Sequence, residues 1–187
     1  MSRILYDKDI REPLFNFLDA EYGKIRIIEE KTMGKSRADA VMVMEDALCG
    51  IEIKSDADTY TRLASQVKDY DKFYDYNYVA VGASHAAHIA EHVPDYWGII
   101  IFDLEGDEAD FYILRRPQPN PKCKPLKKME ILWFKELSNI CVLNKMPKYT
   151  SKSKKFIREK LLYKVPADVL NRQISDELFN RDYTLFK

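Results

Sequence analysis

Apolar and polar positions in the first 114 residues follow two different periods. Apolar side chains recur at spacings of three and four in residues 9–21, 58–74 and 84–92, and this spacing predicts amphipathic helices. Short apolar or alternating runs predict strands at residues 24–30, 40–44, 48–54, 78–81, 97–102 and 111–114. The order of these elements predicts a mixed α/β core, in which a helix and three strands are followed by a helix, a strand, a short helix and two strands.

The remaining residues have a different pattern. Prolines 117, 119, 121 and 125 favour extended backbone and interrupt any helix, so residues 115–125 are predicted to form a connector. Beyond it, helical spacing returns in residues 126–143, 153–163 and 167–180. We therefore predict a core over residues 1–114, a proline-rich connector over 115–125 and a helical extension over 126–187.

Composition indicates a globular protein with no membrane partner. The chain of 187 residues is 46% hydrophobic, which is enough for a core, and its longest strongly apolar run, residues 98–102, is far shorter than the ~20 residues that span a bilayer. The N-terminal residues carry acids where a signal peptide needs an apolar stretch. The three cysteines lack C-x-x-C spacing, so neither a disulfide framework nor a zinc site is indicated. We expect a soluble, cytoplasmic protein.

A net charge of zero conceals a strong division of charge. Residues 1–114 contain 12 Lys and Arg against 23 Asp and Glu, whereas residues 115–187 contain 18 against 7. The basic half could hold a polyanion, or the two halves could simply attract each other. The candidate phosphate contacts are Lys148, Lys152, Lys154, Lys155 and Arg158 around the start of a predicted helix, where a solvated helix end is the alternative.

Two charged residues share one face of an otherwise apolar strand. Side chains alternate along a strand, so Glu52 and Lys54 point to the face opposite Ile53. If residues 45–46 form a two-residue turn, Met44 pairs with Ala47, and the same ladder places Asp39 opposite Glu52. Two carboxylates and an ammonium group would then converge at one end of the sheet.

This arrangement suits metal-assisted hydrolysis of phosphodiesters. Opposed carboxylates repel each other unless a cation lies between them, and hard ions such as Mg²⁺ or Mn²⁺ prefer oxygen ligands. Lys54 could orient or deprotonate the attacking water, or neutralise developing negative charge. The alternative is a cross-strand salt bridge on a solvated sheet face.

The combination resembles the PD-(D/E)XK nuclease superfamily, which has the restriction-endonuclease-like fold. The signature corresponds to Asp39 followed by Glu52-Ile53-Lys54, with Ala38 in place of the usual proline. Gln66 and Tyr70 match the QxxxY motif of the exonuclease-like branch of this superfamily. The resemblance extends to small bacterial and phage proteins that have a helical C-terminal extension, some with a role in DNA repair or phage defence.

The resemblance implies roles for individual residues. Asp39, Glu52 and the backbone carbonyl of Ile53 would hold the ion, Lys54 would serve the water, and Gln66 would abut the active site. A further acid commonly comes from the first helix or first strand, where Glu29, Glu30 and Glu12 are the candidates. The residues expected to contact the substrate strand are Tyr70, Arg37 and Arg62.

Three functions remain open at this stage. The first is a metal-dependent nuclease acting on DNA, and the second is a nucleic-acid-binding module of the same fold without catalysis. The third is a ribonuclease with the same ion chemistry. The extension could also mediate self-association or contact another protein. His85, His88 and His92 share a helical spacing, which we interpret as a polar face or a substrate contact rather than a metal site because no cysteine accompanies them.

Overall fold

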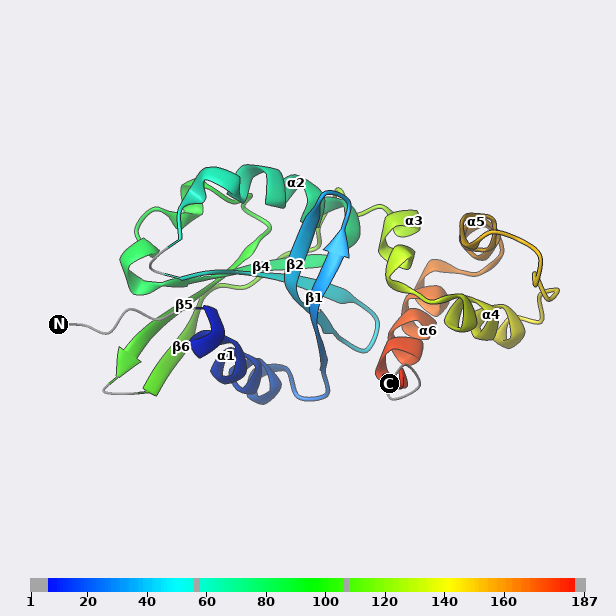
Figure 1. Cartoon of the computed structure of the whole chain (residues 1–187), viewed down its shortest axis with the longest axis horizontal. Helices are drawn as coiled ribbons and strands as arrows, with labels where there is room; N and C mark the ends of the chain where they lie inside the picture. Colours follow the sequence, from blue (N-terminus) through cyan, green and yellow to red (C-terminus); the bar gives the residue numbers. More distant parts are fainter. Residues whose placement is uncertain (1–6, 56–57, 106–107, 184–187) are drawn as a thin grey trace.

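The protein has a mixed α/β fold with a group of helices at its C-terminal end, as the sequence predicts. The computed structural model describes residues 7–55, 58–105 and 108–183 (Figure 1). The sheet has six strands, and its order follows the sequence from one edge to the other. The strands are β1 (Arg26–Met33), β2 (Ser36–Val43), β3 (Leu48–Lys54), β4 (Tyr76–Gly82), β5 (Gly98–Glu105) and β6 (Glu108–Arg115).

The central strands are parallel and the outer ones antiparallel. β3 pairs with β4 and β4 pairs with β5 in parallel, while β1–β2, β2–β3 and β5–β6 are antiparallel. A parallel pair needs a crossover connection, and η1 (Tyr60–Arg62) with α2 (Leu63–Phe73) supplies it between β3 and β4. β3 is buried along its whole length, as expected of a strand covered on both faces.

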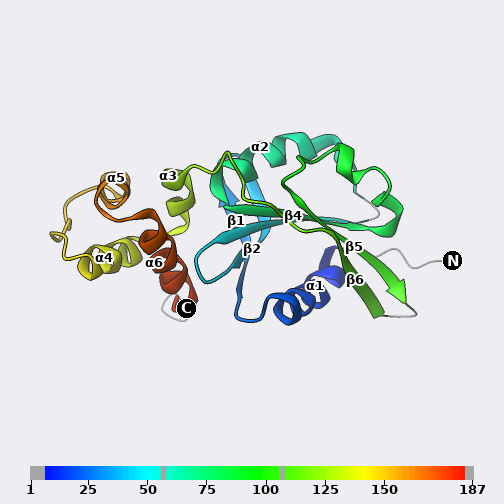
Figure 2. The ribbon, with the colours of Figure 1, turned by 180° about the vertical axis from the view of Figure 1, so that it is seen from behind.

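Helices cover the two faces of the sheet, each burying one apolar stripe. α1 (Asp7–Tyr22) places Ile10, Leu14 and Leu18 against one face, and α2 places Val67 and Tyr70 in the cluster on the other. Figures 1 and 2 show the sheet between these helices from opposite sides. The charged end of β3 therefore lies between two apolar layers.

The predicted short helix at residues 84–92 is wrong in detail. The structure has two 3₁₀ turns there, η2 (Ala83–His85) and η3 (Ile89–Glu91). The ring of Tyr60 packs against His85 and His92, with centroids 5.1 and 4.3 Å away. These ring contacts join the segment to Tyr60 in η1, and helical spacing within residues 84–92 does not reveal them.

The C-terminal part contains more elements than predicted. They are α3 (Pro125–Lys128), η4 (Met129–Ile131), α4 (Phe134–Leu143), α5 (Lys154–Lys164) and α6 (Ala167–Phe179). The prediction of one helix over residues 126–143 is wrong, because Leu132 and Trp133 have extended backbone. The Glu136 carboxylate accepts a hydrogen bond from the Trp133 amide at 2.7 Å and so starts a new helix there.

The Glu136 carboxylate has a second, buried partner. Arg181, beyond α6, donates to both of its oxygens at 2.6 Å and also lies over the Trp133 ring. The same guanidinium donates to the Ile131 carbonyl at 2.9 Å. Arg181 thus fastens the end of the described chain to the break between η4 and α4.

The helices of the extension share one hydrophobic cluster with the α2 side of the sheet. That cluster runs from Val79 and Val67 through Leu137 to Leu178. The Lys128 ammonium is buried in the same region and binds the Asp75 carboxylate at 2.8 Å and Asn171 Oδ1 at 2.5 Å. Packing and a buried ion pair therefore tie the extension to the sheet.

The connector is also bonded to the core along its length. The backbone amides of Gln118, Asn120 and Lys124 donate to the carbonyls of Tyr96, Asp75 and Lys72, respectively. Within the described residues, no helix has the length and apolar character needed to cross a membrane.

Candidate active site

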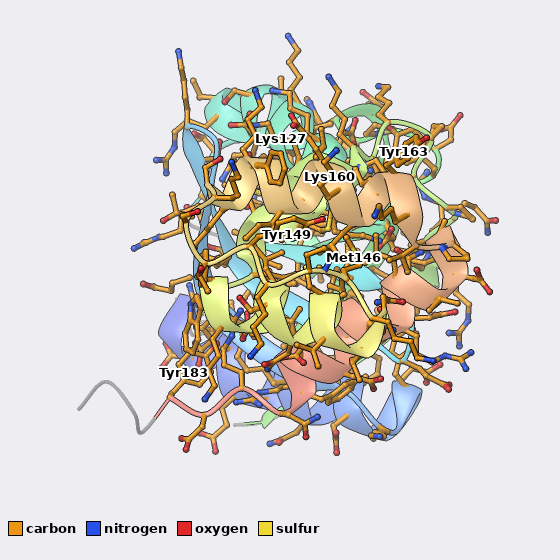
Figure 3. The ribbon with its side chains drawn as sticks, turned by 90° about the vertical axis from the view of Figure 1, so that its right-hand side faces the viewer. Lys127, Met146, Tyr149, Lys160, Tyr163 and Tyr183 are labelled. Atoms are coloured by element: carbon orange, nitrogen blue, oxygen red, sulfur yellow. The ribbon has the colours of Figure 1, made fainter. Side chains whose placement is uncertain are left out.

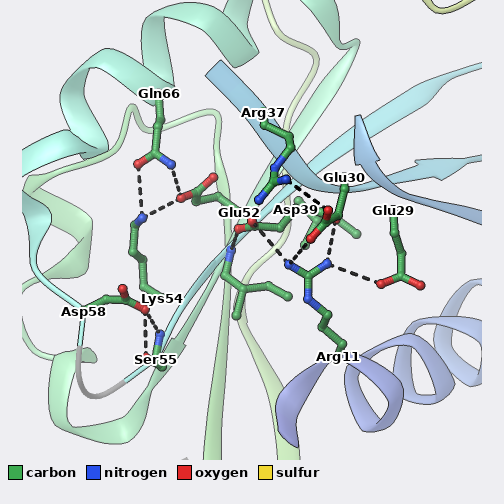
Figure 4. A network of polar contacts seen from close by, with 12 residues as sticks. Arg11, Glu29, Glu30, Arg37, Asp39, Glu52, Lys54, Ser55, Asp58 and Gln66 are labelled. Carbon is green, nitrogen blue, oxygen red and sulfur yellow. Dashed lines mark hydrogen bonds and ion pairs between the residues drawn. The ribbon is translucent and has the colours of Figure 1, made fainter. Parts of the chain in front are cut away.

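The hairpin register predicted from the sequence is confirmed. The Met44 amide donates to the Ala47 carbonyl at 2.9 Å, and the ladder continues as Val43–Leu48 through to Ala40–Ile51. Asp39 and Glu52, the next positions, are brought to the same end of the sheet. They lie beside each other in the close view of the site (Figure 4).

Beyond the last regular pair of β2 and β3, the carboxylate of Asp39 serves as the hydrogen-bond partner of β3. Asp39 Oδ2 accepts a hydrogen bond from the Ile53 amide at 2.8 Å, so a side chain replaces a backbone carbonyl as partner of β3. The regular pairing of β2 with β3 ends one residue earlier, at Ala40 and Ile51. Asp39 is therefore fixed by the end of β3, next to the carboxylate that sequence reasoning had paired with it.

Glu52, Lys54 and Gln66 form a tight polar triangle on the α2 side of β3. Lys54 Nζ lies 2.5 Å from Glu52 Oε1 and 3.1 Å from Gln66 Oε1, and Gln66 Nε2 donates to Glu52 Oε1 at 2.5 Å. Glu52 and Lys54 are only 1% and 4% exposed. The alternative of an exposed salt bridge on a solvated face is wrong, because α2 covers this end of the strand.

Tyr70 joins the two carboxylate-bearing residues. Its hydroxyl accepts from the Asp39 amide at 3.3 Å and lies 2.8 Å from Glu52 Oε2 and 2.9 Å from the Ile51 carbonyl. Burial, followed by the charges of Glu52 and Asp39, raises the pKa of Tyr70 well above its ordinary value. The hydroxyl consequently stays protonated, and its proton can be donated to Glu52 or to the Ile51 carbonyl.

The expected contact of Tyr70 with substrate needs correction. The residue is 0% exposed because α2 packs its ring against Tyr74 and Trp97, at centroid distances of 5.6 and 5.4 Å. Gly50 makes room for this ring, since a β-carbon there would lie 2.5 Å from Tyr70 Cδ1. Tyr70 therefore positions Glu52 and offers no surface to a ligand.

Arg11, a residue that sequence reasoning missed, approaches the site from α1. Its guanidinium donates to the Asp39 carbonyl at 3.0 Å and lies 3.6 Å from Asp39 Oδ1. It also lies 3.3 Å from Glu29 Oε2 and 3.8 Å from Glu30 Oε1. No motif points to an arginine at this position, because its approach depends on where α1 packs.

Glu29 and Glu30 are brought near Asp39 through Arg11, whereas Glu12 is exposed on α1. Glu30 has a positive φ of 52°. The regular pairing of β1 with β2 skips this residue, whereas its neighbours Glu29 and Lys31 pair with Ala40 and Ala38. The Glu30 carboxylate also receives Arg37 Nη1 at 3.0 Å. Arg37 is thus placed at the rim of the site, with its side chain 60% exposed.

Asp58 hydrogen-bonds back to Ser55, the residue that follows β3. Asp58 Oδ2 accepts from both the amide and the hydroxyl of Ser55, at 2.9 and 2.8 Å. Arg62 lies farther along, exposed in η1. In the described part of the chain, no group of three or more His, Cys, Asp or Glu side chains surrounds one point in a manner that could hold a metal ion.

The basic residues predicted around the start of α5 do not all project together. Lys154 Nζ donates to the Leu132 carbonyl at 3.4 Å, and Lys155 lies 3.9 Å from Glu159. Arg158 has a buried Nε without a hydrogen-bond partner among the described residues. Lys148 and Lys152 are exposed in the segment before the helix, and Lys152 lies over the Phe156 ring.

Comparisons with known proteins place the chain in a phage family. A search of solved structures finds SfsA of Pyrococcus furiosus, determined in complex with Ca²⁺, with a TM-score of 0.40 and 14% sequence identity over 63% of this chain and 67% of that one. A comparison with curated protein sequences finds no match. The family model described as bacteriophage P4 protein cII matches residues 1–184, nearly the whole length. The chain therefore belongs to the bacteriophage P4 cII protein family.

Proposed function

We propose that this protein is a divalent-metal-dependent nuclease, with DNA as its expected substrate and its active site at the end of β3. The observation that carries the proposal is the buried triangle of Glu52, Lys54 and Gln66 beside Asp39. An acid and a lysine two residues apart at the end of a covered strand, with a second acid across the hairpin, match the pattern of the PD-(D/E)XK nucleases.

The donor atoms fit Mg²⁺ or Mn²⁺ in their chemistry. Asp39, Glu52 and the Ile53 carbonyl supply hard oxygens, which these ions prefer. A bound ion here would polarise the phosphoryl oxygen and balance charge in the transition state. Because Lys54 and Arg11 now neutralise these carboxylates, loading the ion requires both cations to give up part of their contact.

Lys54 is the residue proposed to act on the attacking water. Its ammonium is held by Glu52 on one side and by the Gln66 amide oxygen on the other, so its direction is fixed. If Lys54 first loses a proton to solvent, the neutral amine could accept a proton from the attacking water. If it stays charged, the ammonium would stabilise the negative charge that develops on the phosphoryl oxygens. Gln66 and Tyr70 act as positioning residues for Lys54 and Glu52.

The proposal is tested with purified full-length protein and labelled single-stranded DNA, duplex DNA and RNA. Cleavage should require Mg²⁺ or Mn²⁺, stop in EDTA, and be lost in Glu52→Gln and in Lys54→Met. Arg172→Gln is the control, because it removes a charge on α6, away from the site. Cleavage by Glu52→Gln at the wild-type rate would refute the proposal. A preference for RNA would instead select the ribonuclease.

A second candidate, a nucleic-acid-binding module without catalysis, is favoured by one observation. Each charged group of the triangle already has a partner within the protein, as it would in a network that serves only stability. The two candidates differ in whether the wild-type protein cleaves nucleic acid. A binding module would not cleave it, and the Lys54→Met variant of such a module would lose stability and keep its affinity for nucleic acid.

A further inference from the structure

The outer surface of the extension carries a large excess of positive charge. Between residues 122 and 164 there are 13 Lys and Arg against three Glu. Glu136 is buried with Arg181, Glu130 pairs with Lys127 at 3.0 Å, and Glu159 lies 3.9 Å from Lys155. Few carboxylates are therefore left to neutralise the exposed lysines.

Three elements bring these lysines into one continuous surface. α2 contacts α3, and α3 contacts α5, so the three lie along one edge of the molecule in both ribbon views (Figures 1 and 2). The Lys124 amide donates to the Lys72 carbonyl at 3.0 Å, and Lys127 lies over the Phe73 ring. These contacts join the end of α2 to α3.

Lysines and aromatic rings lie close together on α5 and at its start. Lys152 and Lys160 both lie over the Phe156 ring, at 5.5 and 5.4 Å from its centroid. Tyr163 follows, flanked by Lys160 and Lys164, and is 86% exposed, the most of any large hydrophobic residue described. Figure 3 shows Lys127, Lys160 and Tyr163 on the α5 side of the extension, and the Tyr149 ring packs beside them against Phe156 with centroids 5.3 Å apart.

Ion pairing within the protein leaves several of these lysines available. Among the described residues, no carboxylate lies within ion-pair distance of Lys124, Lys160 or Lys164. We name the surface of Lys124, Lys127, Lys152, Lys160, Lys164 and Tyr163 the lysine surface. Cations beside an exposed aromatic ring, here Tyr163, suit single-stranded nucleic acid, since phosphates pair with the cations and a base stacks on the ring.

We propose that the lysine surface binds single-stranded nucleic acid and leads the strand along α2 towards the candidate active site. α2 has Phe73 beside the lysine surface and Gln66 at the site, about 10 Å apart at the helical rise per residue. The strand's direction towards cleavage rests on the proposed nuclease function, whereas its binding to the surface does not. A carboxylate-rich site repels phosphate, so a separate cationic surface explains how the polyanion is held nearby.

A single strand suits the surface better than a duplex. The bases of a duplex are stacked inside it and cannot lie on Tyr163, whereas an unpaired base has a free face. An acidic protein would also satisfy the lysines, but it would make no use of an exposed ring flanked by two of them. Tyr163 therefore separates these ligands in an experiment.

The test measures binding without cleavage. Fluorescence anisotropy in EDTA, at several salt concentrations, compares a labelled 20-nucleotide oligothymidine with a labelled 20-base-pair duplex, and poly-glutamate is added as a competitor. The test variant combines Lys124→Gln, Lys160→Gln and Lys164→Gln. The matched control combines Lys24→Gln, Lys135→Gln and Lys145→Gln, three exposed lysines outside the lysine surface with the same total charge change.

The triple variant should bind the oligonucleotide roughly tenfold or more weakly, and its log–log salt slope should fall by about 0.7 for each phosphate that the protein no longer neutralises. The control triple should change little. Tyr163→Ala should weaken single-strand binding roughly fivefold or more, while Tyr163→Phe retains it, because the ring is what stacks. Circular dichroism confirms that each variant is folded.

Three results would overturn the proposal. The first concerns the lysines: affinity and slope are unchanged in the triple variant, or the control triple loses as much affinity. The second concerns the stacking ring: Tyr163→Ala binds the single strand as well as the parent does, or the duplex binds as tightly as the single strand. The third is poly-glutamate competing as well as oligothymidine of equal charge, which selects an acidic protein. Because cleavage is absent from the assay, an inactive site leaves the outcome unaffected.

Discussion

The guanidinium of Arg11 lies 3.6 Å from Asp39 Oδ1 and donates to the Asp39 carbonyl at 3.0 Å. It is also the cation nearest to Glu29, at 3.3 Å, among the described residues. An arginine on α1 thus neutralises Asp39, one of the two carboxylates proposed to hold a divalent ion. Under that proposal, Arg11 and the ion would compete for the carboxylate oxygens of Asp39.

Replacing Arg11 should therefore strengthen metal binding. Arg11→Met removes the positive charge that Arg11 places beside Asp39 and Glu29, so the free protein should melt at a lower temperature and gain more stability from Mn²⁺. Calorimetric titration with Mn²⁺ should show a severalfold lower Kd. Arg37→Met removes a charge that is 60% exposed and should change the Kd less. A weaker Mn²⁺ affinity in Arg11→Met would show that the arginine does not compete.

Gln66 should matter for rate more than for binding. Its amide oxygen accepts from Lys54 and its amide nitrogen donates to Glu52, so Gln66→Leu frees both side chains to reorient. Under the proposed function, kcat should fall by roughly 10- to 100-fold, the range typical of residues that orient the ligands of a metal site. The Kd for oligonucleotide in EDTA should stay near the wild-type value. A loss confined to KM would assign Gln66 to substrate binding.

The ion pair between Arg181 and Glu136 should be the most sensitive electrostatic contact in the extension. Both side chains are nearly inaccessible, and removing one partner leaves a buried charge unpaired. Arg181→Met should lower the free energy of unfolding by about 3–5 kcal/mol in urea titrations. Lys155→Met, which breaks an exposed pair with Glu159, should cost at most about 1 kcal/mol. Equal losses of unfolding free energy in Arg181→Met and Lys155→Met would mean that Arg181 acts through packing alone.

Asp69 should contribute stability that depends on pH. Burial opposes its ionisation, but hydrogen bonds from Ser36 at 2.6 Å and Lys72 at 3.1 Å outweigh this and lower its pKa. A carboxyl whose folded pKa lies below its unfolded pKa stabilises the fold above the unfolded value, about 3.9. That contribution is lost as the pH falls through the lowered folded value.

The measurement compares wild type with Asp69→Asn in urea at a series of pH values. The variant should be less stable at pH 7, and the difference should shrink progressively below about pH 4. A Ser36→Ala background should reduce the difference, because the shortest hydrogen bond to Asp69 is absent. A constant difference across this range would contradict the lowered pKa.

Gly50 should be intolerant of even a methyl group. A β-carbon there would lie 2.4 Å from Tyr74 Cδ2 and 2.5 Å from Tyr70 Cδ1, so both rings would have to move. Overpacking of this kind typically costs about 1–3 kcal/mol. Since Tyr70 holds Glu52, Gly50→Ala should also change the near-ultraviolet circular dichroism and lower activity. Unchanged spectra and activity would show that the rings adjust freely.

The parts of the site that follow from local periodicity were predictable, and those that follow from tertiary packing were not. Alternation along β3 and the turn at residues 45–46 were enough to obtain the register that brings Asp39 to Glu52. Helical spacing placed Gln66 on α2 but could not show that Tyr70, one turn later, is wholly buried. That burial depends on Trp97, which belongs to another element.

Arg11 and Trp133 illustrate the same limit. Nothing in the local sequence around Arg11 shows that α1 will bring it to Asp39, because the distance is set by how α1 packs on the sheet. The break before α4 depends on a carboxylate that caps the helix and also binds Arg181, 45 residues away. Long-range contacts of this kind leave no periodic signal.

The buried Lys128 ammonium, held between Asp75 and Asn171, has a consequence for how the family varies over time. A change at Asp75 alone leaves the buried Lys128 ammonium without its ion-pair partner, and a change at Lys128 alone removes the counter-charge of the half-buried Asp75 carboxylate. Either single change should lower the stability of the fold, so the two positions should change together across related chains. Mosaic chains that join the first half of one relative to the second half of another should fold only when both parents carry compatible residues at these positions.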